Sequence, residues 1–243
     1  MKEREIFSSL RTTSPFFIRL DGRSFRSTAL ALSLKKPFDE DFSHAMEEVS
    51  RLLLGQSGLA PVFAYTFSDE ISLYFRTLPF EGRVEKLDSV AASYAASALT
   101  IILSLEAPLS CDARIVPVDQ DMAIEYCIWR QKEAWRNHTN AYCQWALAED
   151  GLSGKDVQQQ LHRMNTAGMH DLMHARGINL AKTPAWQRRG VMVCRRVESY
   201  AGYNPETGED VLTDRTRIVC DRSPPVFNTA EGREYLRLLL TGP

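Results

Sequence analysis

The chain has 243 residues, a formal net charge of −2, 44% hydrophobic residues and 25% charged residues. This balance is ordinary for a soluble globular protein and excludes a broadly basic chain, so any binding to nucleic acid must use a local basic surface. The five cysteines (111, 127, 143, 194 and 220) form no CxxC pair, which argues against a disulfide framework or a zinc ribbon and favours buried thiols in a reducing cytoplasm.

Residues 1–14 predict a short polar helix that leads into the first strand. The first five residues contain no apolar signal core, and no apolar run in the chain reaches about 18 residues. We therefore expect a cytosolic protein without a membrane partner.

The first strand is predicted for the apolar run that begins at Phe16 and ends in Asp21 and Gly22. Such a run is typical of a buried strand whose end delivers a carboxylate to the edge of a sheet. Gly22 allows the backbone to turn sharply and to approach a ligand closely. An isolated Asp-Gly pair more often only makes a turn, so the functional interpretation depends on a second acidic turn further along the chain.

Between these turns, residues 24–37 lack clean periodicity, and a helix is predicted over residues 39–54. Asp39 or Asp41 could cap this helix. Lys36 precedes it and could meet a triphosphate near Asp21, or it could be a solvated lysine at a helix start.

The second acidic turn is Ser68-Asp69-Glu70, which lies between two β-rich runs within residues 62–75 and predicts a hairpin with acids at its tip. A helix over 84–105 and a strand over 111–118 follow. The order strand, helix, hairpin, helix, strand predicts an α+β fold with a ferredoxin-like βαββαβ core.

A right-handed crossover in that core places Asp21 and Asp69 at the same edge of the sheet, with Glu70 beside them. Converging carboxylates repel one another unless a cation neutralises them, and oxygen ligands of this kind suit Mg²⁺. A sheet edge with two Mg²⁺ ions is the palm of nucleotide polymerases and cyclases, where the ions support in-line phosphoryl transfer.

A long helix is predicted over residues 119–149, and Arg130, Lys132 and Arg136 recur along its charged side, with Asn137 just beyond. A basic surface with amides and aromatic side chains suits phosphates and stacked bases, although an ordinary solvated helix face has the same pattern.

Two shorter helices are expected next, one that starts at Ser153 or Asp156 and one over residues 165–175. The second places His170 and His174 on one face, a spacing that can bind zinc. A zinc protease would need Glu at position 171, which is Asp, and a third ligand, so we do not assign a metal to the pair.

Arg188 and Arg189 lie beside Trp186 and could grip phosphate. The remaining residues predict a strand over 191–197, a hairpin turn over 204–208, a returning strand over 216–220 and an amphipathic helix over about 229–240.

Five segments, in this order along the chain, resemble the tRNA-histidine guanylyltransferase family, and most closely its bacterial and archaeal guanylyltransferase-like members. The match runs from about residue 16 to residue 193. The segments are 19–25 (RLDGRSF), 36–39 (KPFD), 64–70 (AYTFSDE), 177–179 (GIN) and 184–190 (PAWQRRG).

The resemblance implies a polymerase-palm fold that adds nucleotides in the 3′–5′ direction at the 5′ end of tRNA. It implies that the Asp21 and Asp69 carboxylates and the Gly22 carbonyl hold two Mg²⁺ ions, with Glu70 as a nearby support. It also implies a cradle for the triphosphate made by the backbone N–H groups of Arg23, Ser24 and Phe25, with Lys36 and Ser68.

The implied chemistry begins when ATP activates a 5′-monophosphate end, unless the end already carries a triphosphate. The 3′-hydroxyl of GTP or another nucleoside triphosphate then attacks the activated phosphate. Residues 1–120 would form the catalytic core. Residues 121–243 would form a helical and β-hairpin extension that helps to bind tRNA, and the resemblance suggests a homotetramer.

Eukaryotic members carry a His-Ile-Asn-x-x-Tyr-Asn motif in the long helix, and only parts of it survive in residues 135–143. We therefore expect template-dependent repair of 5′-truncated tRNA rather than untemplated guanosine addition to histidine tRNA, and the preferred tRNA and nucleotide stay open. A cyclase-like palm enzyme would share the acids but would not need the basic stretches. A non-catalytic RNA-binding module is disfavoured because the Lys/Arg-Gly-Phe signature is absent.

Overall fold

A six-stranded sheet with the order β4-β1-β3-β2-β5-β6 forms the frame of the structure, and every neighbouring pair is antiparallel. The computed structural model describes residues 4–204, 206 and 208–241. The strands are β1 (Phe16–Gly22), β2 (Phe63–Phe67), β3 (Glu70–Phe75), β4 (Cys111–Pro117), β5 (Val191–Asn204) and β6 (Glu209–Asp221).

The predicted ferredoxin-like core is confirmed in β1 to β4. Strand β3 lies between β1 and β2 and is antiparallel to both, so β1 and β2 run parallel. This arrangement brings the end of β1 and the β2–β3 turn to the same edge of the sheet.

One face of this core is covered by α2 (Glu40–Gly55) and α3 (Val84–Ile102). The Asp39 carboxylate accepts a hydrogen bond from the Phe42 N–H at 2.9 Å, so Asp39 rather than Asp41 caps α2. Alternate residues of β1 pack into a buried apolar cluster with both helices. The cluster includes Ile18, Leu20, Val49, Leu53, Ala91 and Ala95.

The opposite face is covered by α4 (Gln120–Glu149) and α8 (Ala230–Thr241), which form a second cluster with Phe17 and Tyr65 of the sheet. The far half of α4 leaves the sheet and packs against α5 (Gly154–His162) and α6 (Thr166–His174) in a third cluster. The side chains of Ser153 and Asn165 cap these two helices. Helix α4 therefore connects the sheet to the group of short helices α5 and α6.

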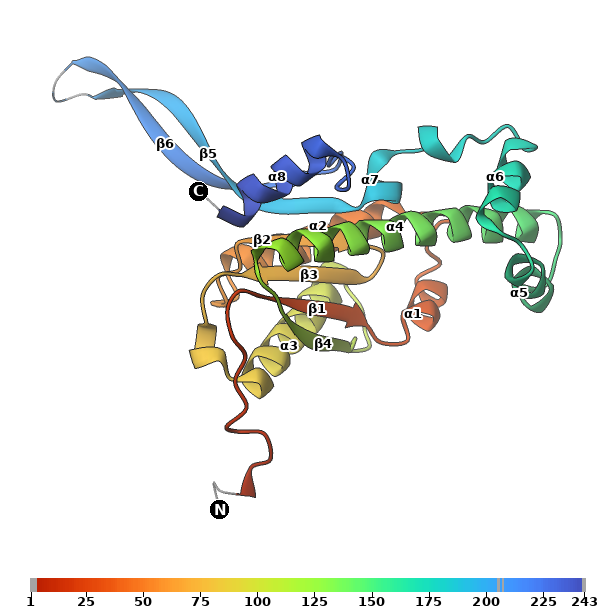
Figure 1. Ribbon diagram of the computed structural model, residues 1–243, viewed down its shortest axis with the longest axis horizontal. Coiled ribbons are helices and arrows are strands. Elements are labelled where there is room, and N and C mark those ends of the chain that lie inside the picture. Colours follow the sequence, from red (N-terminus) through yellow and green to blue (C-terminus); the bar gives the residue numbers. More distant parts are fainter. Residues whose placement is uncertain (1–3, 205, 207, 242–243) are drawn as a thin grey trace.

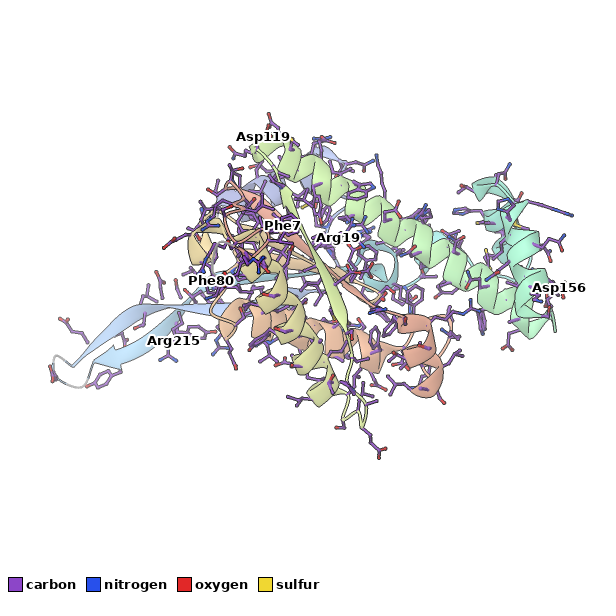
Figure 2. The ribbon with its side chains drawn as sticks, turned by 90° about the horizontal axis from the view of Figure 1, so that it is seen from below. Phe7, Arg19, Phe80, Asp119, Asp156 and Arg215 are labelled. Atoms are coloured by element: carbon purple, nitrogen blue, oxygen red, sulfur yellow. The ribbon has the colours of Figure 1, made fainter. Side chains whose placement is uncertain are left out.

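The β5–β6 hairpin projects from the body at the end opposite to α5 and α6 (Figure 1). In Figure 2, Arg215 lies on this hairpin, Asp156 lies at the other end, and Arg19 lies between them. Both strands extend further than the sequence pattern predicted. Of the predicted turn over 204–208, residues 205 and 207 lie outside the described residues.

The predicted N-terminal helix is wrong for the described part of residues 1–14, which contains turns and an isolated bridge between Arg11 and Arg83. Its apolar residues, Ile6, Phe7 and Leu10, stay exposed, and its backbone instead bonds to residues 82–84, where the Val84 N–H donates to the Leu10 carbonyl at 3.2 Å. An isolated helix of this length does not pay its nucleation cost in water. The sequence also missed α1 (Phe25–Ala31), which begins after Ser24 in a left-handed conformation with φ of 56°.

Further short elements are 3₁₀ segments at Pro79–Gly82 and Leu180–Lys182, and α7 (Ala185–Arg189). All five cysteines are free thiols; three are buried, and Cys111 and Cys220 are partly exposed. Within the described ranges, no helix has the length and apolarity needed to cross a membrane.

Candidate active site

The end of β1 and the turn between β2 and β3 meet at one edge of the sheet, as the sequence pattern predicted. Asp21 lies directly opposite Glu70 in the β1–β3 register. The Gly22 N–H donates to the Asp69 carbonyl at 3.3 Å. A Cβ atom added to Gly22 would lie 2.9 Å from Asp69 Oδ2, so the Asp69 carboxylate lies against the Gly22 backbone. Only glycine leaves room for this carboxylate.

The Asp69 carboxylate has little in the protein to stabilise its charge. Burial raises the pKa of Asp69, and the negative charge of Asp21 raises it further. A hydrogen bond from Ser68 Oγ to Asp69 Oδ1, 2.9 Å long, opposes the rise in pKa. A bound cation would relieve the repulsion between the two acids.

The oxygen atoms at this edge fit Mg²⁺. The donors would be the carboxylates of Asp21 and Asp69 and the carbonyl of Gly22, all hard oxygen ligands. No group of three or more His, Cys, Asp or Glu side chains that could hold a metal ion occurs in the described chain, so such a site would rely on this carbonyl and on other oxygens.

Neighbouring strands add charged residues that the sequence analysis missed. Asp21 pairs with Asp112 of β4, and Arg19 pairs with Arg114 in the next row on the same face. Arg114 and Asp112 form an ion pair of 3.4 Å. These residues become visible in the sequence only once the strand order and register are known, because alternation then assigns them to the face of Asp21.

Glu70 is buried and is paired with Arg130 of α4. Arg130 Nε donates to Glu70 Oε1 at 2.8 Å, and Arg130 Nη2 donates to Glu70 Oε2 at 2.5 Å. Burial raises the pKa of Glu70 to about 7, and the Arg130 guanidinium opposes this rise. Glu70 therefore lies beside Asp69 in the chain while its carboxylate is held by α4.

The expectation that Arg130 belongs to an exposed basic surface is wrong, because Arg130 is only 6% exposed. The face of α4 that carries Arg130 packs on β3, where Glu70 supplies the opposite charge. Helical spacing alone could not distinguish this inward arginine from its exposed neighbours.

The residues expected to cradle a triphosphate lie around the start of α1. The Arg23 N–H donates to the Ser110 carbonyl at 2.9 Å, so this amide is already engaged, which corrects its expected role. The amides of Ser24 and Phe25 lie where α1 begins. Ser68 is in the acidic turn, and Lys36 is exposed in the segment between α1 and α2.

Three of the six residues expected to bind RNA line one cleft between α4 and α7. These are Lys132, Arg188 and Arg189, and Trp135 and Asn228 share the cleft. Hydrogen bonds orient both arginines of the cleft: Arg188 Nε donates to the Thr183 carbonyl at 2.8 Å, and Arg189 Nη1 donates to the Pro224 carbonyl at 3.1 Å. The cleft is therefore basic and partly ordered by the fold.

The other expected RNA contacts are dispersed. Arg136 is exposed and bonded to Glu133. Asn137 lines a separate pocket next to the acidic turn. The walls of that pocket include Ser68, Phe38, Phe42, Phe67 and Trp186.

The His170 and His174 pair does not gather further metal ligands within the described ranges. The His170 ring stacks on Trp135 at a centroid distance of 6.0 Å, and His174 is exposed. His170 thus packs on an aromatic side chain that borders the basic cleft.

The sequence matches a known family over its first half. Residues 1–119 match the family model described as tRNAHis guanylyltransferase. The chain is 29% identical over 214 residues to a tRNA(His) guanylyltransferase of Neurospora crassa, an alignment that covers 82% of this chain and 72% of that protein. It is 27% identical over 194 residues to a probable tRNA(His) guanylyltransferase of Bos taurus, covering 74% and 65%.

A further relative is tRNA(His) guanylyltransferase 2 of Arabidopsis thaliana, at 25% identity over 202 residues. That alignment covers 78% of this chain but only 37% of the plant protein. The chain therefore spans only part of the length of some curated relatives.

Solved structures resemble almost the whole chain. A bacterial tRNA(His) guanylyltransferase-like protein in complex with ATP has a TM-score of 0.74 and 26% identity, covering 99% of this chain and 96% of that one. The same kind of protein in complex with GTP has a TM-score of 0.70 and 26% identity, with the same coverage. The tRNA(His) guanylyltransferase of Saccharomyces cerevisiae shares the fold, with a TM-score of 0.66 and 20% identity over 82% of this chain and 88% of that one.

Proposed function

Because this chain is a relative of the tRNAHis guanylyltransferase family, we propose that it is a nucleotidyltransferase that extends the 5′ end of tRNA in the 3′–5′ direction. The observation that carries the proposal is the pair of carboxylates, Asp21 and Asp69, packed around Gly22 at the edge of a palm-like sheet. Nucleoside triphosphates, with ATP for activation and GTP for addition, are the proposed substrates.

In the proposed site, Asp21, Asp69 and the Gly22 carbonyl would hold two Mg²⁺ ions. When bound, the ions would neutralise charge that develops on the phosphoryl oxygens and would favour the ionised form of the attacking hydroxyl. Ser68 orients the Asp69 carboxylate through its hydrogen bond. Lys36, Ser68 and the amides of Ser24 and Phe25 would contact the triphosphate and hold it in line for attack.

The chemistry would proceed in two transfers. In the first, an oxygen of the RNA 5′-monophosphate bonds to the α-phosphorus of ATP, and pyrophosphate leaves. In the second, the 3′-hydroxyl of the incoming nucleotide bonds to the RNA 5′ phosphorus, AMP leaves, and the hydroxyl proton passes to solvent. An RNA that already has a 5′-triphosphate would skip the first transfer and release pyrophosphate in the second.

The proposed biological role is template-dependent repair of 5′-truncated tRNA. Two observations support this role: the partial motif over residues 135–143, and the likeness to a bacterial guanylyltransferase-like protein over 99% of the chain. A cytoplasmic location and a homotetrameric state are part of the same proposal. Guanosine addition to histidine tRNA is the second candidate, since the curated relatives are tRNA(His) guanylyltransferases.

The decisive experiment incubates purified protein with Mg²⁺, ATP, labelled GTP and a tRNA that lacks its first nucleotide. A tRNA that lacks only the extra 5′ guanosine serves as the competing substrate. We expect addition to the truncated tRNA only when the nucleotide pairs with the opposite strand. Addition of guanosine regardless of the opposite base would support the histidine-tRNA role instead.

A cyclase-like palm enzyme would consume nucleotide when RNA is absent. The same assay therefore includes a reaction without RNA, in which we expect no turnover above background. Turnover without RNA, together with no extension of either tRNA, would overturn the proposed function.

The basic cleft gives a separate prediction. Replacing both Arg188 and Arg189 with Ala should weaken tRNA binding and reduce the slope of log Kd against log salt by about 2, because two phosphate contacts would be lost. Filter binding over a range of KCl concentrations measures both quantities. Arg233→Ala/Arg237→Ala, which removes the same charge from α8, is the matched control and should leave the slope unchanged. An equal effect of the two double variants would mean that tRNA responds to net charge and not to the cleft.

A further inference from the structure

The Glu70–Arg130 ion pair joins the acidic turn to α4 and is removed from solvent. Glu70 is 8% exposed and Arg130 is 6% exposed. Two hydrogen bonds of 2.8 and 2.5 Å connect them in the bidentate geometry that fixes a carboxylate most firmly. The pair is therefore a rigid connection and not a mobile surface contact.

Aromatic rings hold the guanidinium in place. The Arg130 guanidinium carbon lies 4.3 Å from the centre of the Trp129 ring and 5.3 Å from that of the Phe67 ring. Phe67 ends β2 immediately before the acidic turn, so the arginine contacts residues on both sides of Ser68 and Asp69. A lysine ammonium group at this position could not form the two parallel hydrogen bonds to Glu70 and would lose much of the stacking on the two rings.

A second polar contact joins α4 to β3, two residues further along β3 from the acidic turn. The Tyr126 hydroxyl is hydrogen-bonded to Ser72 Oγ at 2.9 Å. Tyr126 and Arg130 are one helical turn apart on α4, and Ser72 and Glu70 are on the same face of β3. Helix α4 is thus aligned on β3 by two polar contacts, of which only Arg130 reaches the acidic turn.

The pair also separates the roles of three neighbouring carboxylates. Glu70 follows Asp69 in the chain and lies opposite Asp21 in the β1–β3 register. Arg130 neutralises Glu70, while no Lys, Arg or His nitrogen of the described residues lies within 4.0 Å of the Asp21 or Asp69 carboxylates. Arg130 thus takes Glu70 out of the group of free carboxylates, which leaves Asp21 and Asp69 beside Gly22, while Asp112 opposite Asp21 is paired with Arg114.

We propose that Arg130 is a positioning residue of the cation site: it holds Glu70 so that the turn that carries Asp69 stays against Gly22 and Asp21. This inference rests on the proposed function for the presence of a divalent cation at these acids. It assigns Arg130, which the sequence pattern placed among RNA contacts, to the organisation of the metal site.

The test measures cation binding directly, with Mn²⁺ as the probe and electron paramagnetic resonance of the unbound ion as the readout. Arg130→Lys keeps the positive charge and removes the pair of parallel hydrogen bonds to Glu70. We expect the Kd for Mn²⁺ to rise about tenfold or more, because losses of this size follow when residues that hold metal ligands in place are changed. Tyr126→Phe removes the neighbouring contact between α4 and β3 and is the matched control, with a Kd within about twofold of wild type. An unchanged Kd in Arg130→Lys, or an equal rise in Tyr126→Phe, would overturn the proposal.

A double-variant cycle tests whether Arg130 acts through Glu70. In the Glu70→Gln background, Arg130→Lys should weaken Mn²⁺ binding no further, because the partner that it positions has already been changed. A further rise in Kd of the same size would show that Arg130 acts by another route. If Arg130→Lys does not fold, as judged by circular dichroism, Arg130→Gln/Glu70→Gln removes both charges together, and its Kd must still rise for the proposal to stand.

Failure of the proposed function has a different signature. Mn²⁺ binding that depends on Arg130, with no extension of any RNA, would count against the proposed reaction and support the assignment of Arg130. Absence of saturable Mn²⁺ binding in the wild-type protein would overturn the cation site itself, and the assignment of Arg130 with it.

Discussion

Asp69→Asn is expected to reduce nucleotidyl transfer by about 10³-fold or more and, in the same protein, to increase the stability of the metal-free fold. The first effect follows because the variant loses a ligand of the proposed metal site, and metal ions supply several kcal/mol of transition-state stabilisation. The second follows because the Asp69 carboxylate is buried and repelled by Asp21, so its charge disfavours the folded state. The tRNA extension assay and thermal unfolding in EDTA measure the two effects.

The gain in stability should depend on pH in a definite direction. The pKa of Asp69 is higher in the folded chain than its ordinary value of 3.8. Ionisation therefore destabilises the folded wild type above its raised pKa, and this penalty disappears as the pH falls below 3.8. Asp69→Asn should gain most over wild type near neutral pH and little in acid. An equal gain at both pH values would place its origin elsewhere.

Asp88→Asn is the matched control for this prediction. Asp88 lies on α3, burial raises its pKa, and its Oδ1 atom is buried without a hydrogen-bond partner among the described residues. Its replacement should also increase stability while leaving extension activity within about twofold of wild type, because surface and structural acids away from the site do not enter the chemistry. Loss of activity in both variants would mean that the assay responds to stability and not to the metal ligands.

Gly22→Ala is expected to reduce activity by about 10²-fold with little change in folding. The added Cβ would lie 2.9 Å from Asp69 Oδ2 and 3.2 Å from Asp69 Cβ, so the Asp69 side chain must move. A shift of about 1 Å in a positioned group can cost this much in rate. Steady-state extension assays, with thermal unfolding of the same sample, separate the loss of activity from a loss of structure.

Gly154→Ala provides the comparison, because a Cβ at Gly154 meets no atom within 4 Å. It should retain wild-type activity. Full activity in Gly22→Ala would mean that the contact between Gly22 and the Asp69 carboxylate is not needed for the reaction, and that would remove the main geometric support for the site.

The sequence was most informative where local pattern and topology agree. The run that ends in Asp21, the hairpin tip at Asp69 and the helices between them are each set by short-range patterns, and the crossover rule then brings the two acids together. The helix predicted for the N-terminal segment failed because its backbone pairs with residues 82–84, a long-range contact that a local pattern cannot show.

Arg130 could not be assigned from the sequence because its partner, Glu70, is 60 positions away and its own neighbours on α4 are also charged or aromatic. The same limit applies to Arg114 and Asp112 of β4, whose proximity to Asp21 depends on strand register. The full length of β5 and β6 was missed because polar residues on both faces of an exposed hairpin give no clear alternation.

The order of strands in the sheet has a consequence for how the chain is made. Strand β2 lies between β3 and β5, and the Tyr65 hydroxyl reaches the Arg189 carbonyl across 124 positions of sequence. Both acids are synthesised before the strand that covers β2 and before the arginine that pairs with Glu70. A nascent chain or fragment that ends at residue 120 would expose the unpaired edge of β2, which is a template for aggregation. Residues 121–243 therefore complete both the sheet beside β2 and the ion pair of Glu70, and each of these completes the edge that carries the two acids.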